Sequence, residues 1–191
     1  MSLSELYEGC RTYRRFSQDP VPENVIGEIF SNLRARSSAR NGQILKFYVI
    51  QSPEKLAEMQ PLVKWAGALP PEIGTPKQGE QPTAFVVITK PENAGGFSDV
   101  DVGIAADTIA LTAWNHGFGS CMMGAINTKE IGKLLELPEG ENVRLAIALG
   151  RPAHKSTIVD VPEDGCLNYY VDGERNYYVP KKTVAEISKI V

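Results

Sequence analysis

The sequence is poor in the residues that metal centres and disulfide frameworks require. It has three cysteines, Cys10, Cys121 and Cys166, without a C-x-x-C spacing, and two histidines, His116 and His154. An odd number of scattered cysteines argues against a secreted disulfide framework, so we expect reduced thiols. Without H-E-x-x-H or a histidine cluster we expect no metal site, and we assign both histidines to structure or surface.

A strong charge of one sign and long apolar runs are also lacking. The net charge is −3, from 20 lysines and arginines against 23 acidic residues. Such a balance gives no general attraction to nucleic acid or anionic lipid. No stretch approaches about eighteen consecutive apolar residues, and the first residues lack the pattern of a secretory signal. We therefore expect a soluble, cytoplasmic protein that binds neither nucleic acid nor membranes.

Several catalytic motifs are absent as well. The chain contains neither the P-loop G-x-x-x-x-G-K-[ST] nor the hydrolase elbow G-x-S-x-G. The glycines of residues 117–124 superficially resemble a dinucleotide loop, but they follow a predicted helix where that motif needs a strand. Cys121, Met122 and Met123 within this segment are expected to fill space rather than to do redox chemistry.

The apolar pattern predicts one domain, residues 1–191, of mixed helices and strands. An uninterrupted apolar run over residues 84–89 is typical of a central strand. Nearly every residue of 101–115 is apolar or small, which predicts a helix without a wide solvent face. Strands are predicted at 47–51, 84–89 and 143–149, and helices at 22–33, 54–63, 101–115 and 127–135.

Two segments do not fit this core. Residues 65–81 are rich in proline and glycine, and we expect a mobile lid there. Residues from about 160 to 191 carry turn signals at Asp164-Gly165 and Asp172-Gly173, with only scattered apolar residues between them. This segment predicts a C-terminal arm that packs on the body or wraps a second subunit.

Two polar segments carry the candidate chemistry. Arg11, Arg14 and Arg15 bring three guanidinium groups beside the hydroxyl of Thr12, which suits a phosphate; the alternative is a solvated basic face. Residues 38–43, SARNGQ, concentrate donors and acceptors in a loop before a core strand. Such a loop suits the edge of a heterocycle, although an ordinary polar connection is the alternative.

Together with three later segments, these two resemble the nitroreductase family. The similar segments occur in the family's order across almost the whole chain. They are CRTYRRF at 10–16, SSARNGQILKF at 37–47, DVGIAADTIALTAW at 101–114 with GFGSCMMG at 117–124, ALGRP at 148–152 and VPKK at 179–182.

The resemblance implies an α+β, three-layer fold with a largely antiparallel central sheet flanked by helices. It implies a homodimer with FMN at the interface and an exchanged C-terminal segment. NAD(P)H would be the electron donor, and electrons would pass by a ping-pong mechanism to a nitroaromatic, a quinone or a similar small acceptor. The alternatives are a flavin-binding redox sensor or storage protein without turnover, a specialised relative such as a dehalogenase or flavin destructase, or a flavin-free interaction module.

The resemblance also assigns flavin contacts, though no catalytic side chain. Cys10 stands where the family often has an arginine, and Lys181 and Lys182 would compensate. Tyr13 and Lys64 are candidates, with Trp65, for the substrate face, against the alternative of packing. The implied cofactor-binding residues are Arg11, Thr12, Arg14, Ser38, Arg40, Asn41, Gln43, Gly124, Ala125, Lys181 and Lys182, with Arg15 a weaker candidate.

Overall fold

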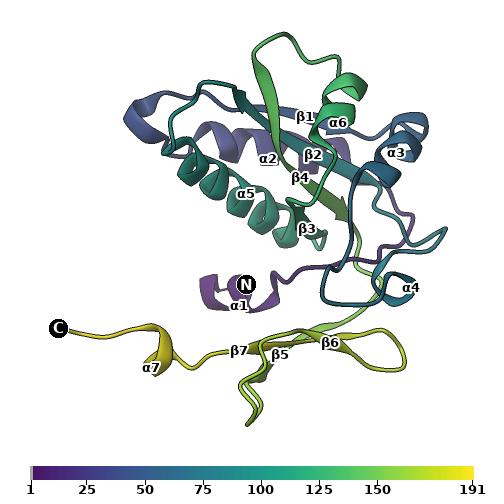
Figure 1. The fold of residues 1–191 in the computed structure, drawn as a ribbon, viewed down its shortest axis with the longest axis vertical. Helices are drawn as coiled ribbons and strands as arrows, with labels where there is room; N and C mark the ends of the chain where they lie inside the picture. Colours follow the sequence, from purple (N-terminus) through teal and green to yellow (C-terminus); the bar gives the residue numbers. More distant parts are fainter. Residues whose placement is uncertain (1) are drawn as a thin grey trace.

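A computed structural model describes residues 2–191 and places a four-stranded sheet at the centre of the molecule (Figure 1). The strand order is β1-β2-β4-β3, and all neighbours are antiparallel. The strands are β1 (Lys46–Ile50), β2 (Ala84–Pro91), β3 (Gly119–Met123) and β4 (Glu141–Gly150). The expected α+β class with an antiparallel central sheet is confirmed.

Helices cover both faces of this sheet. On one face, Val86 and Ile88 of β2 pack with apolar residues of α2 (Glu23–Arg34) and α5 (Ser98–Asn115). On the other face, Phe85 and Val87 pack with residues of α3 (Pro53–Met59) and α6 (Thr128–Leu134). Successive side chains of a strand point to opposite faces. The continuous apolar run of β2 therefore follows from burial on both sides, as expected of a central strand.

Besides shifts of one to three residues at other ends, one helix is shorter than expected and one strand was missed. The helix expected over 54–63 ends at Met59, and Gln60–Leu62 forms a 3₁₀ turn, η2. Pro61 lacks the amide that a further α-helical turn would use. Strand β3 was not predicted at all, because Gly119 and Ser120 are weak strand formers and only pairing with β4 makes this segment extended.

The C-terminal residues form a second, smaller sheet, which lies beside the body in Figure 1. Its order is β5-β7-β6, with β5 parallel to β7 and β6 antiparallel to it. The strands are β5 (Ser156–Asp160), β6 (Tyr170–Val171) and β7 (Tyr177–Lys181), followed by the one-turn helix α7 (Val184–Ile187). We call residues 153–181 the C-terminal hairpin layer and residues 183–191 the tail. The layer begins before residue 160, where the arm was expected to start.

Three short helical segments complete the fold. Helix α1 (Leu3–Gly9) begins with a capping box at Ser2 and Glu5 and lies against α5. A 3₁₀ turn, η1 (Ala39–Asn41), interrupts the predicted polar loop. The single turn α4 (Pro71–Gly74) lies within the segment that was expected to be a mobile lid.

Candidate functional site

The arginine-rich N-terminal segment lies along the beginning of β3. Thr12 forms a parallel bridge with Ser120, and the amide of Tyr13 donates to the Ser120 carbonyl at 2.8 Å. The Tyr13 ring stacks on Trp114 of α5 with their centroids 5.2 Å apart. A Cβ at Gly119 would lie 2.5 Å from the Tyr13 ring, so only glycine permits this approach. The segment is therefore held rigidly by the body.

The three arginines of this segment differ in what they contact. Arg15 is already occupied by groups of the chain, because it pairs with Glu80 at 3.5 Å and donates to the carbonyls of Glu174 and Arg175 at 3.0 Å each. Within residues 2–191, neither Arg11 nor Arg14 forms an ion pair. An arginine without a carboxylate partner is available to an anionic ligand. This difference agrees with the lower ranking of Arg15.

The guanidinium of Arg14 has an unusual environment. Its carbon lies 4.4 Å from the centroid of the Tyr169 ring and 4.9 Å from that of Tyr177. Its Nε is buried without a hydrogen-bond partner. The Nε of Arg15 is unpartnered in the same way, so the two aromatic rings, and not this nitrogen, distinguish Arg14.

The predicted turn at Gly124 and Ala125 follows the far end of β3. Gly124 is exposed, and a Cβ added there would meet nothing within 4 Å. The amide of Lys64 donates to the Ala125 carbonyl at 3.0 Å, so Lys64 does lie beside this turn. At about 3.3 Å per residue, the four steps from Ser120 to Gly124 span about 13 Å. The segment with the free arginines thus lies beside the start of β3, and the open turn follows the end of that strand.

The other two candidates for the substrate face fit the alternative interpretation, in which they are packing residues. Tyr13 and Trp65 are both buried in the hydrophobic cluster on one face of the sheet.

Burial raises the pKa of the Cys121 thiol to about 11, which suits a space-filling role. Burial also raises the pKa of Cys10 to about 11, so this thiol stays neutral and places no negative charge beside Arg11.

The loop of residues 38–43 is tightly folded on itself. The Ser38 hydroxyl accepts from the amide of Gln43 at 3.1 Å, and the Asn41 side chain accepts from that of Gln43 at 3.2 Å. Arg40, Asn41 and Gln43 have φ values of 54°, 53° and 47°. Left-handed backbone at three non-glycine residues is strained, and such strain clusters at ligand sites. The loop borders a cavity of about 300 Å³ lined by α2, α5 and the start of β1.

The two groups of predicted flavin contacts lie at opposite ends of α5. The loop is anchored at the beginning of this helix, where Asp101 accepts from the Ala39 amide at 2.9 Å. The arginine segment is anchored near its end by Trp114. At about 1.5 Å per residue, Asp101 and Trp114 are about 20 Å apart along the helix axis. A single chain therefore does not combine the two groups in one pocket.

Lys181 and Lys182 are the last two of the predicted flavin contacts. Both are exposed at the end of β7, where Lys181 lies opposite Asp160 of β5. No hydrogen bond or ion pair within residues 2–191 joins either lysine to the arginine segment. Their role as compensating cations stays a prediction.

Comparison with known proteins agrees with this geometry. The Nitroreductase family model matches residues 8–151, which includes the arginine segment, the loop, α5 and β3. The chain belongs to the nitroreductase family. It is 26% identical over 159 residues to the FMN reductase [NAD(P)H] of Bacillus subtilis (strain 168), a match that covers 76% of this chain and 64% of that relative. The chain thus spans somewhat less than two thirds of that relative's length.

Solved structures share the fold of this nitroreductase-family chain. An FMN-dependent nitroreductase from Clostridium difficile R20291 superposes with a TM-score of 0.68 at 20% identity, covering 81% of this chain and 90% of the other. A nitroreductase family protein from Streptococcus pneumoniae TIGR4 superposes with a TM-score of 0.69 at 17% identity, covering 85% and 97%. Among residues 2–191, no helix is both long enough and apolar enough to cross a bilayer.

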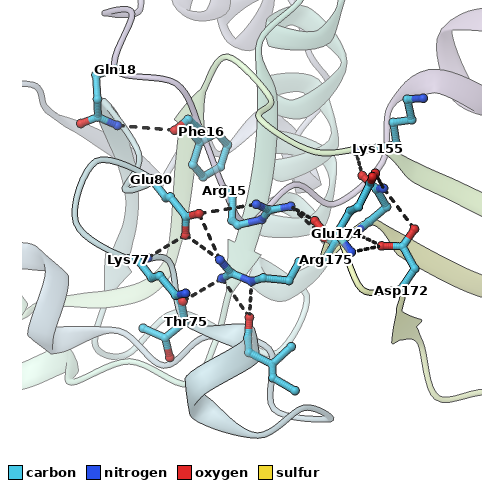
Figure 2. A network of polar contacts seen from close by, with 12 residues as sticks. Arg15, Phe16, Gln18, Thr75, Lys77, Glu80, Lys155, Asp172, Glu174 and Arg175 are labelled. Carbon is cyan, nitrogen blue, oxygen red and sulfur yellow. Dashed lines mark hydrogen bonds and ion pairs between the residues drawn. The ribbon is translucent and has the colours of Figure 1, made fainter.

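The family match ends at Arg151, and the hairpin layer that follows carries the most extensive polar network of this nitroreductase-family chain (Figure 2). Figure 2 shows Arg15 and Arg175 both directed at Glu80. Arg175 donates to Glu80 at 3.0 and 2.9 Å, to the Ile73 carbonyl at 3.2 and 3.0 Å and to the Thr75 carbonyl at 3.2 Å. The hydroxyl of Tyr169 accepts from the Ala68 amide at 3.3 Å. The hairpin layer thus ties residues 65–81 to the body.

Sequence reasoning missed this network. The Asp172-Gly173 signal did locate the turn between β6 and β7, where Asp172 accepts from the amides of Glu174 and Asn176. Nothing near Arg175 in the sequence indicated that its partners lie about a hundred residues earlier. Burial alone would raise the pKa of Glu80. Hydrogen bonds from the Lys77 amide and from Arg175 outweigh burial and hold that pKa below its ordinary value.

His154 lies at the junction of the body and the hairpin layer. Its ring meets Tyr13 and Tyr177 edge-on, with centroid separations of 5.4 and 4.8 Å. Both ring nitrogens are buried without partners. Burial, with the positive charge of Arg15 adding to it, lowers the pKa of His154 to about 4. The residue is therefore a neutral packing group, in keeping with a structural role.

Proposed function

We propose that this nitroreductase-family chain is an FMN-dependent NAD(P)H oxidoreductase that works as a homodimer. The observation that carries the proposal is the pair Arg11 and Arg14. Among residues 2–191 they have no carboxylate partner, and they lie in the segment beside β3, the strand that leads to the open turn at Gly124. The B. subtilis relative, an FMN reductase [NAD(P)H], supports the choice of cofactor and donor.

The residues present fit this cofactor. Arg11, Arg14 and the hydroxyl of Thr12 would hold its phosphate and part of its ring, with Lys181 and Lys182 as further cations. The amides of Gly124 and Ala125 would donate toward the reacting edge, where the missing Cβ permits close approach. When bound, FMN supplies hydride acceptance from NAD(P)H and electron transfer to a small acceptor such as a nitroaromatic or a quinone. The chain itself binds and orients, and donor and acceptor take turns in one pocket.

A second copy of the chain would complete the site. The loop with Ser38, Arg40, Asn41 and Gln43 is anchored at one end of α5, and the arginine segment of the same chain is anchored about 20 Å away along the helix axis. In a twofold dimer, each loop is free to reach the partner's arginine segment. The tail supports this assembly, because Val184, Ile187 and Ile190 are 76%, 70% and 100% exposed. Apolar side chains without a partner on their own chain suit an exchanged segment.

An absorbance spectrum tests the proposal directly. The purified chain is supplemented with FMN, desalted, and titrated anaerobically with NADH and then NADPH. We expect retained flavin bands that bleach with at least one donor. A colourless protein would refute the proposal, and retained flavin that neither donor reduces would favour a sensor, a storage protein or a specialised relative.

Removing the side chain of Arg11 should weaken FMN binding. Charged hydrogen bonds contribute about 1.5–3 kcal/mol, so Arg11→Ala should raise the FMN dissociation constant by about 10- to 150-fold. Fluorescence titration of the apoprotein with FMN measures this change. The control is Arg144→Ala, which removes an arginine from an exposed pair with Asp99 and should leave the constant unchanged. An unaltered constant in Arg11→Ala would remove Arg11 from the site.

Deleting the tail should weaken the dimer. A chain ending at Lys182 loses the exposed apolar residues of the tail and keeps the hairpin layer intact. Sedimentation velocity over a dilution series should therefore show dissociation at higher concentration than for the full chain. Urea unfolding at low concentration should change little, since the tail has no buried residue. A truncated chain that stays dimeric at every dilution would refute the exchange.

A further inference from the structure

The hairpin layer lies almost wholly outside the family match, yet it contacts a predicted flavin residue. Tyr169 precedes β6 and Tyr177 begins β7, and their rings lie 5.8 Å apart with a tilt of 45°. Both rings face the guanidinium of Arg14. Tyr177 is fully buried, and its amide donates to the Lys155 carbonyl at 2.9 Å. The Tyr169 hydroxyl is fixed by the Ala68 amide.

This arrangement holds a cation without neutralising it. Aromatic faces attract a guanidinium through the ring quadrupole, but they carry no net charge. Arg15 shows the contrast, because it is paired with a carboxylate, that of Glu80. Among residues 2–191 no ion pair occupies the terminal nitrogens of Arg14, so these nitrogens are the groups available for a ligand.

We infer that Tyr169 and Tyr177 are positioning residues that fix the guanidinium of Arg14 for an anionic, flavin-class ligand. The inference rests on the proposed function. It extends the flavin site into a layer that the family match does not include, so that hairpin residues determine how tightly FMN is held. Preorganisation supplies the mechanism, because an arginine already held in place loses less side-chain freedom when the ligand binds.

Substitutions at Tyr169 test the inference, because Tyr177 is too deeply buried to change safely. Tyr169→Leu removes the ring. The dissociation constant of FMN, measured with protein reconstituted with FMN, should rise by about 2- to 30-fold. Tyr169→Phe keeps the ring and loses only the hydroxyl, so it should retain near wild-type affinity. The matched control is Tyr170→Leu, which removes a ring that stacks on Tyr178 in the same layer, 5.3 Å away, and does not contact Arg14.

A double-mutant cycle separates positioning from general damage to the hairpin layer. Tyr169→Leu should have no further effect on FMN affinity once Arg14→Leu is present. Equal weakening by Tyr169→Leu and Tyr170→Leu, or an undiminished effect in the Arg14→Leu background, would overturn the inference, as would wild-type affinity in Tyr169→Leu. A wild-type chain that binds no FMN would instead refute the proposed function.

Discussion

Arg175→Ala is expected to lower the free energy of unfolding by about 2–4 kcal/mol, because it removes two of the hydrogen bonds to Glu80 and leaves two backbone carbonyls without their donor. The side chains of Arg175 and Glu80 are only 17% and 24% exposed, so water replaces the lost bonds poorly. Arg15 remains near Glu80, but at 3.5 Å it contacts only one carboxylate oxygen. Urea unfolding monitored by circular dichroism measures the loss.

The same substitution should loosen residues 65–81. Arg175 is the chief link between the hairpin layer and the carbonyls of Ile73 and Thr75, so amide hydrogen exchange should accelerate there before it changes in β2 or β4. Arg144→Ala serves as the control, since its pair with Asp99 is 44% and 48% exposed and such pairs contribute about 0–1 kcal/mol. If both variants lost equal stability, the network of Arg175 would have no special role.

A second large effect is expected on acidification, where His154 should lower the stability of the folded chain. Its pKa is lowered from 6.5 to about 4 in the folded chain, so the unfolded chain binds a proton first as the pH falls. Stability should therefore be highest above the unfolded pKa and fall between about pH 6.5 and pH 4. At 1.36 kcal/mol per unit, the total loss is about 3 kcal/mol, with about 2 kcal/mol of it already lost by about pH 5.

His154→Phe should abolish most of this slope. Phenylalanine keeps an aromatic edge against Tyr13 and Tyr177, and it removes two buried nitrogens that have no partners. Urea unfolding at about pH 7 and about pH 5 gives the comparison, above the range in which Glu80, whose pKa is lowered, begins to lose its contribution. The wild-type chain, unfolded at the same two pH values, is the reference. If His154→Phe kept the wild-type dependence of unfolding free energy on pH, a group other than His154 would be responsible for it.

The central elements were predictable because their signals are local. The apolar run of β2 and the small, apolar composition of α5 each lie within one stretch of chain. Periodicity reports burial directly, and the family motifs added the order of the elements. By contrast, β3 takes its extended form from pairing with β4, a partner more than twenty residues away. No local preference of Gly119 or Ser120 indicated it.

The candidate site, too, was predictable from the sequence only in part. Composition alone indicated a cluster of cations at residues 11–15 and a donor-rich loop at residues 38–43. It did not distinguish the three arginines from one another, because Glu80, Tyr169 and Tyr177 approach them from far along the chain.

The sequence by itself determined the mixed core, the family and the presence of a basic phosphate candidate, since each depends on residue type and spacing along the chain. Only the tertiary structure decided that Arg15 is paired with Glu80, that Arg14 lies against two tyrosine rings and that residues 65–81 are tied down by Arg175. The physical reason is that charge pairing and packing depend on distances in space, which long-range folding sets.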